Sequence, residues 1–497
     1  MKKYFITLCS AALMFSSCDL NINEDPNYPQ SSTITADLMF PAVQNAVVAV
    51  SCDVMFNYAG FFAQYFDQMP EANQFNGLAE LTITESSQTI DGAYSRLYSG
   101  ALTDIEDIKT KTTNTADLFA LAVMRTVAFQ LLVDNMSDCP YTEALQGSAN
   151  PSPIWDDGET VYRGVLAELD AAEQAYNENT ENMTMTDMMF NKNMRQWIGY
   201  ANALRLRMYM RMYDKDNSVK SKIVSLVNDN NFFTDDVMLD IYSNDAGNRS
   251  PFYASYYALG TGNHCAAHPI VSYMSATNDP RIEYAISKTS GSGEYVGQMP
   301  GAKADMKGFG SNTTWKNKDV SAINYVLFDG SGITRPAFLF TQANLQFLIA
   351  EAKYRFMEDE SGAKTAYEAA INADFNARGI AGVGSFLSGA NVNWDNATDK
   401  LNLIYMQKWV ALFYMDNMEA WSEIRRTDVP ALSAYTGKEI YEDASIYNAG
   451  EMIEPYRNGL EAGGLMKRMF YPQTARNLNK NTPAMKPGST PVWWDIN

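Results

Sequence analysis

The sequence predicts a mainly α-helical protein with long loop-rich elaborations and few short strands. Three observations support this fold class. Apolar residues recur at helical spacing along most of the chain, strand-like pieces such as Tyr325–Phe328 are short and lie within loops, and no region alternates strands with helices. The lack of alternation argues against a doubly wound sheet, and therefore against a two-lobed periplasmic binding protein.

Residues 1–17 have the composition of a lipoprotein-type signal peptide. Lys2 and Lys3 precede an apolar run from Tyr4 to Phe15, and Ser16 and Ser17 stand directly before Cys18. The apolar run is too short to span a bilayer, which takes about 20 residues as a helix. The small-small-Cys ending resembles a bacterial lipobox, which predicts lipidation of Cys18. The alternative is an ordinary secreted protein with an incidental cysteine.

Residues 18–35 are interpreted as a flexible acidic tether. The stretch is rich in Asn, Asp, Pro and Ser and carries Asp19, Glu24 and Asp25, a composition that cannot bury a core. Residues 36–497 are expected to form one domain. Its most apolar stretch, Leu38–Met55, contains Pro41 and Asp53 and is interpreted as a buried helix, so a lipid anchor would be the only membrane attachment.

Charge and cysteine content exclude several classes of partner and site. The 497 residues carry a formal net charge of −20, and removal of Lys2 and Lys3 with the signal makes it −22 (−20 minus 2). Such a polyanion is a poor partner for nucleic acid or acidic lipid surfaces. Beyond residue 18 only Cys52, Cys139 and Cys265 remain, which allow at most one disulfide and show no metal-site spacing.

The helices expected along the chain differ in the width of their apolar face. The stretch 114–133 is apolar on nearly every side and should be a buried helix. Residues 161–172 and 197–208 each carry one apolar stripe. Further on, 341–379 holds two alanine-lined segments with a turn expected at Ser361 and Gly362. That pair resembles one tetratricopeptide (TPR) unit, and a second pair is expected at 401–414 and 419–426.

Two long irregular regions near 243–337 and 381–400 separate these helical blocks. They are rich in Gly, Asn and Ser and contain many aromatic residues. Long irregular insertions in a compact domain are usually functional, which makes them the expected ligand face. Aromatic rings offer flat surfaces for sugars, and amides bind hydroxyl groups. Ligand-binding candidates are Gln74, Phe75, Asn76, Tyr295, Asn312, Trp315, Asn393 and Trp394.

Other polar groupings favour structural roles. Glu351, Glu423, Arg425 and Arg426 are interpreted as ion pairs that lock helices together. His264 and His268 flank Cys265, where a zinc hydrolase helix would need Glu, so no metal site is predicted. No cofactor is predicted either, although a structural calcium ion is compatible with the sequence. The carboxylates Asp156, Asp157 and Glu159 precede a helix, which favours their interaction with its dipole over glycosidase chemistry.

Seven segments, in order, resemble the SusD/RagB family of outer-membrane nutrient-binding lipoproteins, and more closely its SusD-like branch. Each is weak alone, but together they cover nearly the whole chain. They are EDPNYP (24–29, after Cys18), LLVDNMSDCPYTEALQG (131–147), MRQWIGYANALRLRMYMR (194–211), NDPR (278–281), LQFLIAEA (345–352), QKWVALFYMDNMEAWSEIRRTDVP (407–430) and MFYPQTARNLN (469–479).

This resemblance implies a right-handed superhelical scaffold of four TPR-like helix pairs. It further implies a lipid-anchored protein at the outer membrane, facing the cell exterior, that is not an enzyme. Such a protein would bind an oligosaccharide nutrient and deliver it to a SusC-like TonB-dependent transporter. Three alternatives stay open: a peptide-binding member of the same family, a surface glycosidase, and an interaction scaffold without a small ligand.

Overall fold

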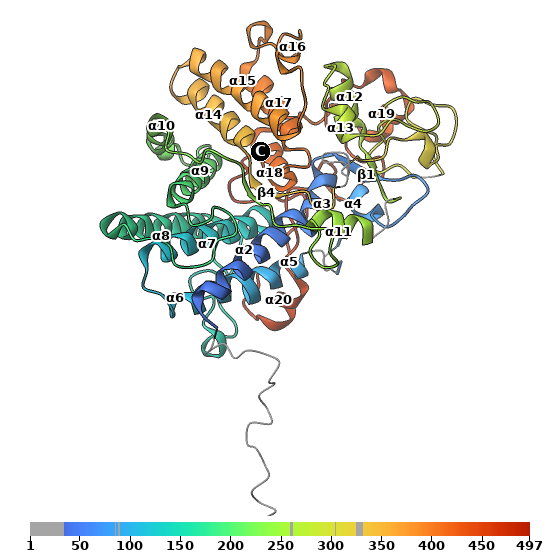
Figure 1. Cartoon of the computed structure of the whole chain (residues 1–497). Coiled ribbons are helices and arrows are strands. Elements are labelled where there is room, and N and C mark those ends of the chain that lie inside the picture. The colour runs from blue at the N-terminus through green and yellow to red at the C-terminus, as the bar shows by residue number, and fades with distance from the viewer. Residues whose placement is uncertain (1–33, 85, 88–89, 259–261, 304, 325–331) are drawn as a thin grey trace, which may run out of the picture.

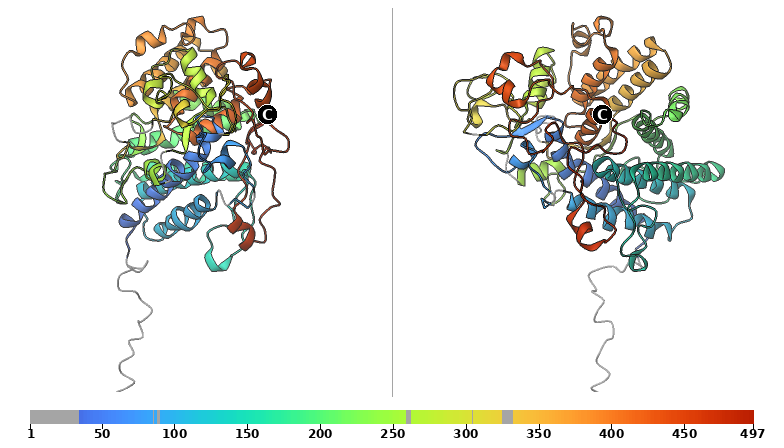
Figure 2. Two further views of the ribbon diagram at one scale, coloured as in Figure 1. Left: turned by 90° about the vertical axis from the view of Figure 1, so that its right-hand side faces the viewer. Right: turned by 180° about the vertical axis from the view of Figure 1, so that it is seen from behind.

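The long helices of the scaffold form where the apolar stripes are continuous. In this computed structural model, which describes residues 34–84, 86–87, 90–258, 262–303, 305–324 and 332–497, most of them lie on one side of the molecule, and α3 and α18 lie near its centre (Figures 1 and 2). Their bounds are α2 Ala36–Cys52, α3 Val54–Phe62, α7 Thr115–Met136, α8 Gly158–Asn179, α9 Met194–Met212, α10 Lys220–Asp229, α14 Gln342–Phe356, α15 Glu360–Ala377, α17 Lys400–Leu412 and α18 Asn417–Thr427.

Shorter helices connect and cover these elements. They are α4 Asn76–Ala79, α5 Asp91–Ser95, α6 Thr103–Lys109, α11 Pro251–Ala258, α12 His268–Ala276, α13 Ile282–Ala285, α16 Val383–Leu387, α19 Gly437–Glu442 and α20 Gln473–Leu478. A π-helical turn at Arg96–Leu102 joins α5 to α6. The cysteine and tether at residues 18–33 and the strand-like piece 325–328 lie outside the described residues.

Strands are few and short, as predicted. In the described part of the chain, β1 Phe66–Gln68 pairs antiparallel with β3 His264–Ala266, and β2 Val237–Leu239 pairs antiparallel with β4 Ala337–Phe340. Both ladders join segments about 100 to 200 residues apart and lie at the border between helices and loops. They therefore fix the loop-rich region to the scaffold without forming a sheet core.

Helix pairs build the scaffold. Within the described residues, α7 packs against α8, α9 against α10, α14 against α15, and α17 against α18, and these four pairs have the expected TPR-like architecture. The helix expected at 114–133 is α7, with the Asn114 side chain accepting a hydrogen bond from the Asp117 amide at its N-terminus. The prediction was wrong about Ser361 and Gly362, which lie in the first turn of α15 because Asp359 caps that helix.

Two helical stretches, Ala36–Phe62 and α7, are long and apolar enough to cross a membrane by length and composition. In the fold α7 is almost wholly buried, and Val43, Val47 and Val48 of α2 have no exposed surface. Both stretches therefore serve as core helices, which agrees with the buried helix expected at 38–55.

A long C-terminal segment returns to the end of α7. The Met469 amide donates to the Asn135 carbonyl (2.7 Å), and the Trp494 indole donates to Asp134 (2.8 Å). The Trp421 indole of α18 donates to the Met466 carbonyl (3.0 Å). Residues 466–495 thus tie α7 to α18, elements almost 300 residues apart.

The loop-rich lobe occupies the opposite side of the molecule, around α12, α13, α19 and β1 (Figures 1 and 2). It has its own small apolar cluster of Met299, Ala302, Met306, Ile440 and Ile453. Because this cluster joins segments 299–306 and 440–453, the lobe is held together independently of the helix pairs.

Candidate functional site

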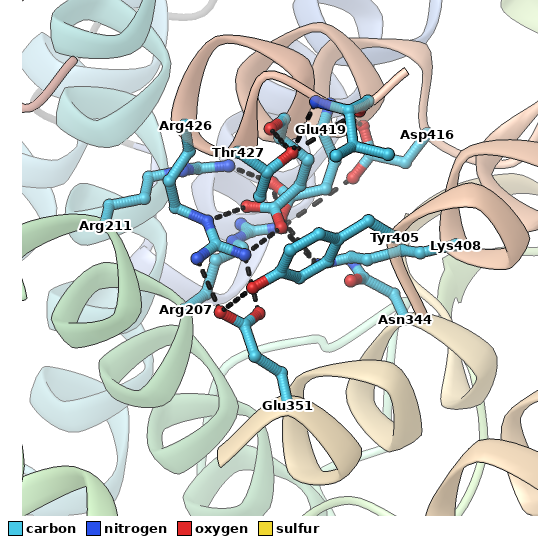
Figure 3. A network of polar contacts seen from close by, with 12 residues as sticks. Arg207, Arg211, Asn344, Glu351, Tyr405, Lys408, Asp416, Glu419, Arg426 and Thr427 are labelled. Atoms are coloured by element: carbon cyan, nitrogen blue, oxygen red, sulfur yellow. Dashed lines mark hydrogen bonds and ion pairs between the residues drawn. The ribbon is translucent and has the colours of Figure 1, made fainter. Parts of the chain in front are cut away.

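A network of buried charges joins the helix pairs (Figure 3). The Arg426 guanidinium of α18 contacts Glu351 of α14 and Glu423 of its own helix, at 2.6 Å each, and the Tyr405 hydroxyl of α17 donates to Glu351 (2.8 Å). Burial alone would raise the pKa of Glu423, but Arg426 and Lys408 hold it well below the usual range. The predicted ion pairs of Glu351, Glu423 and Arg426 are confirmed as internal contacts between helices.

Arg425 has a different environment from the one predicted. Its guanidinium lies 3.7 Å from the centroid of the Trp421 ring and donates to the carbonyls of Asp134 and Lys467. No ion pair of Arg425 is found among the described residues. Burial lowers the pKa of Arg425 to about 9, although nearby carboxylates such as Asp134 oppose this shift. The side chain is therefore a structural cation that ties α18 to the C-terminal segment.

The carboxylates before α8 serve the backbone. Asp157 caps α8 by accepting from the Thr160 amide (2.9 Å), and Asp156 accepts from the Tyr141 and Thr142 amides (3.0 and 2.8 Å). Glu159 pairs with Arg163. This geometry supports the helix-terminus interpretation of the cluster.

The two histidines face different surroundings. His264 lies on β3 among Phe61, Phe66 and Phe75, and burial lowers its pKa to about 3. His268 begins α12 and packs on Phe309. No group of three or more metal-ligating side chains is found in the described residues. The predictions about metals and cofactors stay predictions.

Two of the predicted aromatic contacts are buried in the core. Phe75 is 7% exposed and packs on Phe61 and His264, and Trp394 is 3% exposed and packs on Tyr354 and Tyr367. A ring enclosed in this way offers no face to a sugar, so the expectation of exposed platforms was wrong at these two positions. Both rings have polar neighbours in sequence, but those neighbours do not make the rings accessible.

Those polar neighbours differ in what they do. Gln74 is exposed and Asn76 half-buried at the start of α4. Asn393 is half-buried and is used internally, since it accepts from the Asp395 amide (2.9 Å) and donates to the Leu387 carbonyl (3.2 Å). Gln74 and Asn76 remain accessible to a ligand, whereas Asn393 is committed to its own turn.

The remaining predicted residues lie on the loop-rich lobe. Trp315 and Tyr295 are half-buried and Asn312 is exposed. Trp315 packs beside Met69, and its segment is tied to the 69–76 loop because Glu71 accepts from the Asn317 amide (3.0 Å) and pairs with Lys316 (3.1 Å). The structure therefore brings residues 69–72, which lie just before Gln74, to the Trp315 segment, although more than 240 residues separate them in sequence.

A glycine positions the Trp315 ring. A Cβ atom on Gly308 would lie 1.8 Å from Trp315 Cε2, so only a residue without a side chain fits under the indole. The Tyr295 ring makes a cation–π contact with Lys288, whose ammonium group lies 5.3 Å from the ring centroid. Both aromatic rings are thus fixed on the lobe while keeping part of their surface open.

A groove between α12, the start of α17 and the 449–451 loop was not predicted. We call it the α12–α17 groove, and it has a volume of about 360 Å³. Its lining residues are Tyr273, Asn391, Ala397, Thr398, Asp399, Asn402, Leu403, Met406, Ala431, Ala449, Gly450 and Glu451. They come from four separate stretches of sequence. Tyr273 and the lining residues between 391 and 399 lie in the two loop-rich regions expected to form the ligand face, but none was a ligand-binding candidate and the sequence does not mark the lining as one group.

A second cavity of about 300 Å³, the α18 cavity, lies on the other side of Ala431. Its walls include Phe62, Trp421, Ile424 and Met466. Both cations that line it are already engaged, since Arg425 binds carbonyl groups and Lys467 pairs with Asp495. Its apolar walls are suited to core packing more than to hydroxyl-rich ligands.

Comparison with known proteins agrees with this architecture. A SusD homologue from Flavobacterium johnsoniae that binds chitin has a TM-score of 0.73 at 19% identity, over 93% of this chain and 99% of that one. SusD homologues from Bacteroides fragilis (TM-score 0.70, 20% identity, 93% and 99% covered) and Bacteroides uniformis (0.67, 20%, 92% and 99%) are similar. These likenesses establish the fold. Among curated proteins, none matches the sequence significantly.

The family assignment comes from the sequence itself. The SusD-like family described as "Starch-binding associating with outer membrane" matches residues 26–448, which include the helix pairs, both short ladders and most of the loop-rich lobe. The seven resembling segments and the four helix pairs point to the same result. The chain belongs to the SusD-like family.

Proposed function

We propose that the protein is a cell-surface lipoprotein that binds an oligosaccharide nutrient and delivers it to a TonB-dependent outer-membrane transporter. The observation that carries this proposal is the family match over residues 26–448, in a family described as starch-binding and associated with the outer membrane. The chitin-binding relative from Flavobacterium johnsoniae supports a glycan as the ligand class. The lipobox-like ending at Cys18 supports attachment to the membrane through lipid.

The accessible side chains of the loop-rich lobe are suited to binding a sugar without catalysing a reaction. Trp315 and Tyr295 present partly open rings, and Gln74, Asn76 and Asn312 supply amide groups nearby on the same lobe. Sugars pack their C–H faces on aromatic rings and donate and accept hydrogen bonds through their hydroxyl groups. The carboxylates that a glycosidase would need before α8 are occupied by backbone amides, so a binding role fits better than hydrolysis.

Ligand class is tested with the purified protein from residue 19 onward. Calorimetry against neutral hexasaccharides and against a peptide library should detect saturable binding of at least one oligosaccharide, without release of reducing sugar. Binding of peptides alone would redirect the proposal to a peptide receptor. Reducing-sugar release that is lost in Asp156→Asn would establish a glycosidase instead.

Anchoring and partnership need separate experiments. Mass spectrometry of the membrane fraction should find acyl groups on Cys18, and Cys18→Ala should release the protein from the membrane. Affinity purification of the lipidated protein should recover a TonB-dependent transporter. An unmodified Cys18 thiol, or purification without any transporter, would contradict the respective part of the proposal.

A further inference from the structure

The α12–α17 groove combines an apolar base with a polar rim. Leu403 and Met406 are buried and Tyr273 is half-buried, whereas Thr398 and Asn402 are exposed. Gly450 allows the 449–451 loop to close on this base, because a Cβ atom there would lie 2.9 Å from Tyr273 Cδ2. The result is a hollow with an apolar surface below and hydrogen-bonding groups above, the general pattern of small-molecule sites.

Much of the hydrogen-bonding capacity of the rim is unused. Within the described part of the chain, no hydrogen bond is recorded for the side chains of Thr398 and Asn402. Glu451 accepts from the Asn448 amide group at Oε1 (2.8 Å), while its Oε2 is buried without a partner among the described residues. Hydroxyl groups of a ligand would complete these contacts, since a buried carboxylate oxygen is costly to leave unpaired.

Among the described residues, the lining of the groove contains carboxylates but no cation. Asp399 and Glu451 line it, and its lining has no Lys, Arg or His. The nearest cation in sequence, Lys400, directs its ammonium group to the carbonyls of Trp394 (2.5 Å) and Ala397 (2.7 Å). Arg281 interacts electrostatically with Tyr273, but its guanidinium is fully buried and paired with Asp279 and Asp374. An anionic ligand would therefore meet repulsion without compensation.

We propose that this groove binds a neutral sugar unit of the captured oligosaccharide and rejects acidic sugars such as uronic acids and sulfated residues. The proposal rests on the proposed glycan-binding function and adds a location and a charge preference to it. The C–H face of the sugar lies on Leu403 and Met406. Its hydroxyl groups donate to Asp399 and Glu451 and exchange hydrogen bonds with Thr398 and Asn402.

The test measures affinities for maltohexaose, cellohexaose, chitohexaose and hexagalacturonate. Ala449→Trp places a bulky ring in the groove from an exposed position, and Ala171→Trp places the same ring on the exposed face of α8 as a matched control. We expect at least a tenfold loss of affinity for the neutral ligand in Ala449→Trp and none in Ala171→Trp, with unchanged melting temperatures. Asn402→Ala should weaken binding in the same direction without filling the groove.

Charge preference is tested with Glu451→Gln. The wild-type protein should bind hexagalacturonate at least tenfold more weakly than the best neutral hexasaccharide, and removal of the Glu451 charge should narrow that difference several-fold. Equal wild-type affinity for neutral and acidic hexasaccharides would overturn the charge preference. Neutral binding that survives Ala449→Trp and disappears in Trp315→Ala would overturn the location while the proposed function stands. If no hexasaccharide binds the wild type, the sugar function itself fails.

Discussion

Helix α17 lies between the buried charge network around Arg426 and the α12–α17 groove. It contributes polar side chains to both regions, but those side chains have different roles. Tyr405 and Lys408 point into the buried network around Arg426, whereas Asn402, Leu403 and Met406 line the α12–α17 groove. Residues 402 and 406 are one turn apart and share a face, and 405 and 408 lie on another. On the inner face, the described charges around Arg426 are paired, whereas on the outer face the Asn402 side chain makes no hydrogen bond among the described residues. Paired charges inside the scaffold stabilise the fold, whereas polar side chains without a protein partner can form hydrogen bonds with a ligand.

The largest expected effect is on the inner face. Arg426→Ala removes the cation that Glu351 and Glu423 share and leaves each buried carboxylate with one cation, Arg355 or Lys408, which should cost about 3–5 kcal/mol of unfolding free energy. Urea denaturation followed by circular dichroism measures this loss. Arg163→Ala, at an exposed ion pair of α8, is the control and should cost less than about 1 kcal/mol. Equal losses in both variants would refute the contrast between buried and exposed pairs.

The second prediction concerns acid stability. The folded protein holds His264 neutral, because burial lowers its pKa to about 3, while the unfolded chain protonates it below about 6.5. The unfolded state therefore binds more protons, and stability is lost as the pH falls below 6.5. From pH 7 to pH 5 this residue alone should remove about 2 kcal/mol. His264→Gln should lose that much less over the same interval in parallel denaturation curves; identical pH dependence would contradict the buried neutral state.

The third prediction tests how the loop lobe holds its aromatic surface. Gly308→Ala introduces a Cβ atom against the Trp315 indole and should cost about 1–2 kcal/mol as the loop shifts. Tryptophan emission should move to longer wavelength because Trp315 becomes more exposed. Gly92→Ala in α5, where a Cβ atom meets nothing within 4 Å, is the matched control and should be neutral or slightly stabilising. An unchanged spectrum in Gly308→Ala would show that the glycine does not position the ring.

The smallest stability effect is expected on the outer face of α17. Asn402→Ala should change unfolding free energy by less than about 0.5 kcal/mol, because its side chain is exposed. Loss of one hydrogen bond should nevertheless lower glycan affinity about fivefold, which calorimetry detects. If Asn402→Ala caused a large loss of stability and left glycan affinity unchanged, the outer face of α17 would have a structural role and not a binding role.

The sequence predicted the scaffold well because helical periodicity is local. The segment 114–133 became α7, and the loose TPR-like pair at 341–379 became α14 and α15, although the turn between them lies at 357–359 instead of Ser361 and Gly362. Helix capping explains the difference, because the Asp359 side chain accepts a hydrogen bond from the Gly362 amide (2.8 Å). Helix α15 therefore begins at Glu360, before the turn that was expected at Ser361 and Gly362.

The site was predicted less well because exposure depends on distant neighbours. Phe75, Trp394 and Trp315 are all flanked by polar residues, yet Phe61 with His264, and Tyr354 with Tyr367, enclose the first two. Nothing local distinguishes a ring that a remote helix covers from one that stays open. The α12–α17 groove escaped prediction for the same reason, since Tyr273, Asn402 and Glu451 meet only in the folded chain.

The return of residues 466–495 to α7 has a consequence for biogenesis. A chain that emerges in order from the ribosome presents α7 long before Met469 and Trp494, so Asp134 lacks its indole donor until the last residues are made. Completion of the scaffold is therefore expected only after release of nearly the entire polypeptide. Prematurely terminated copies would lack the segment that joins α7 to α18, and the exposed surfaces of both helices would be open to proteolysis.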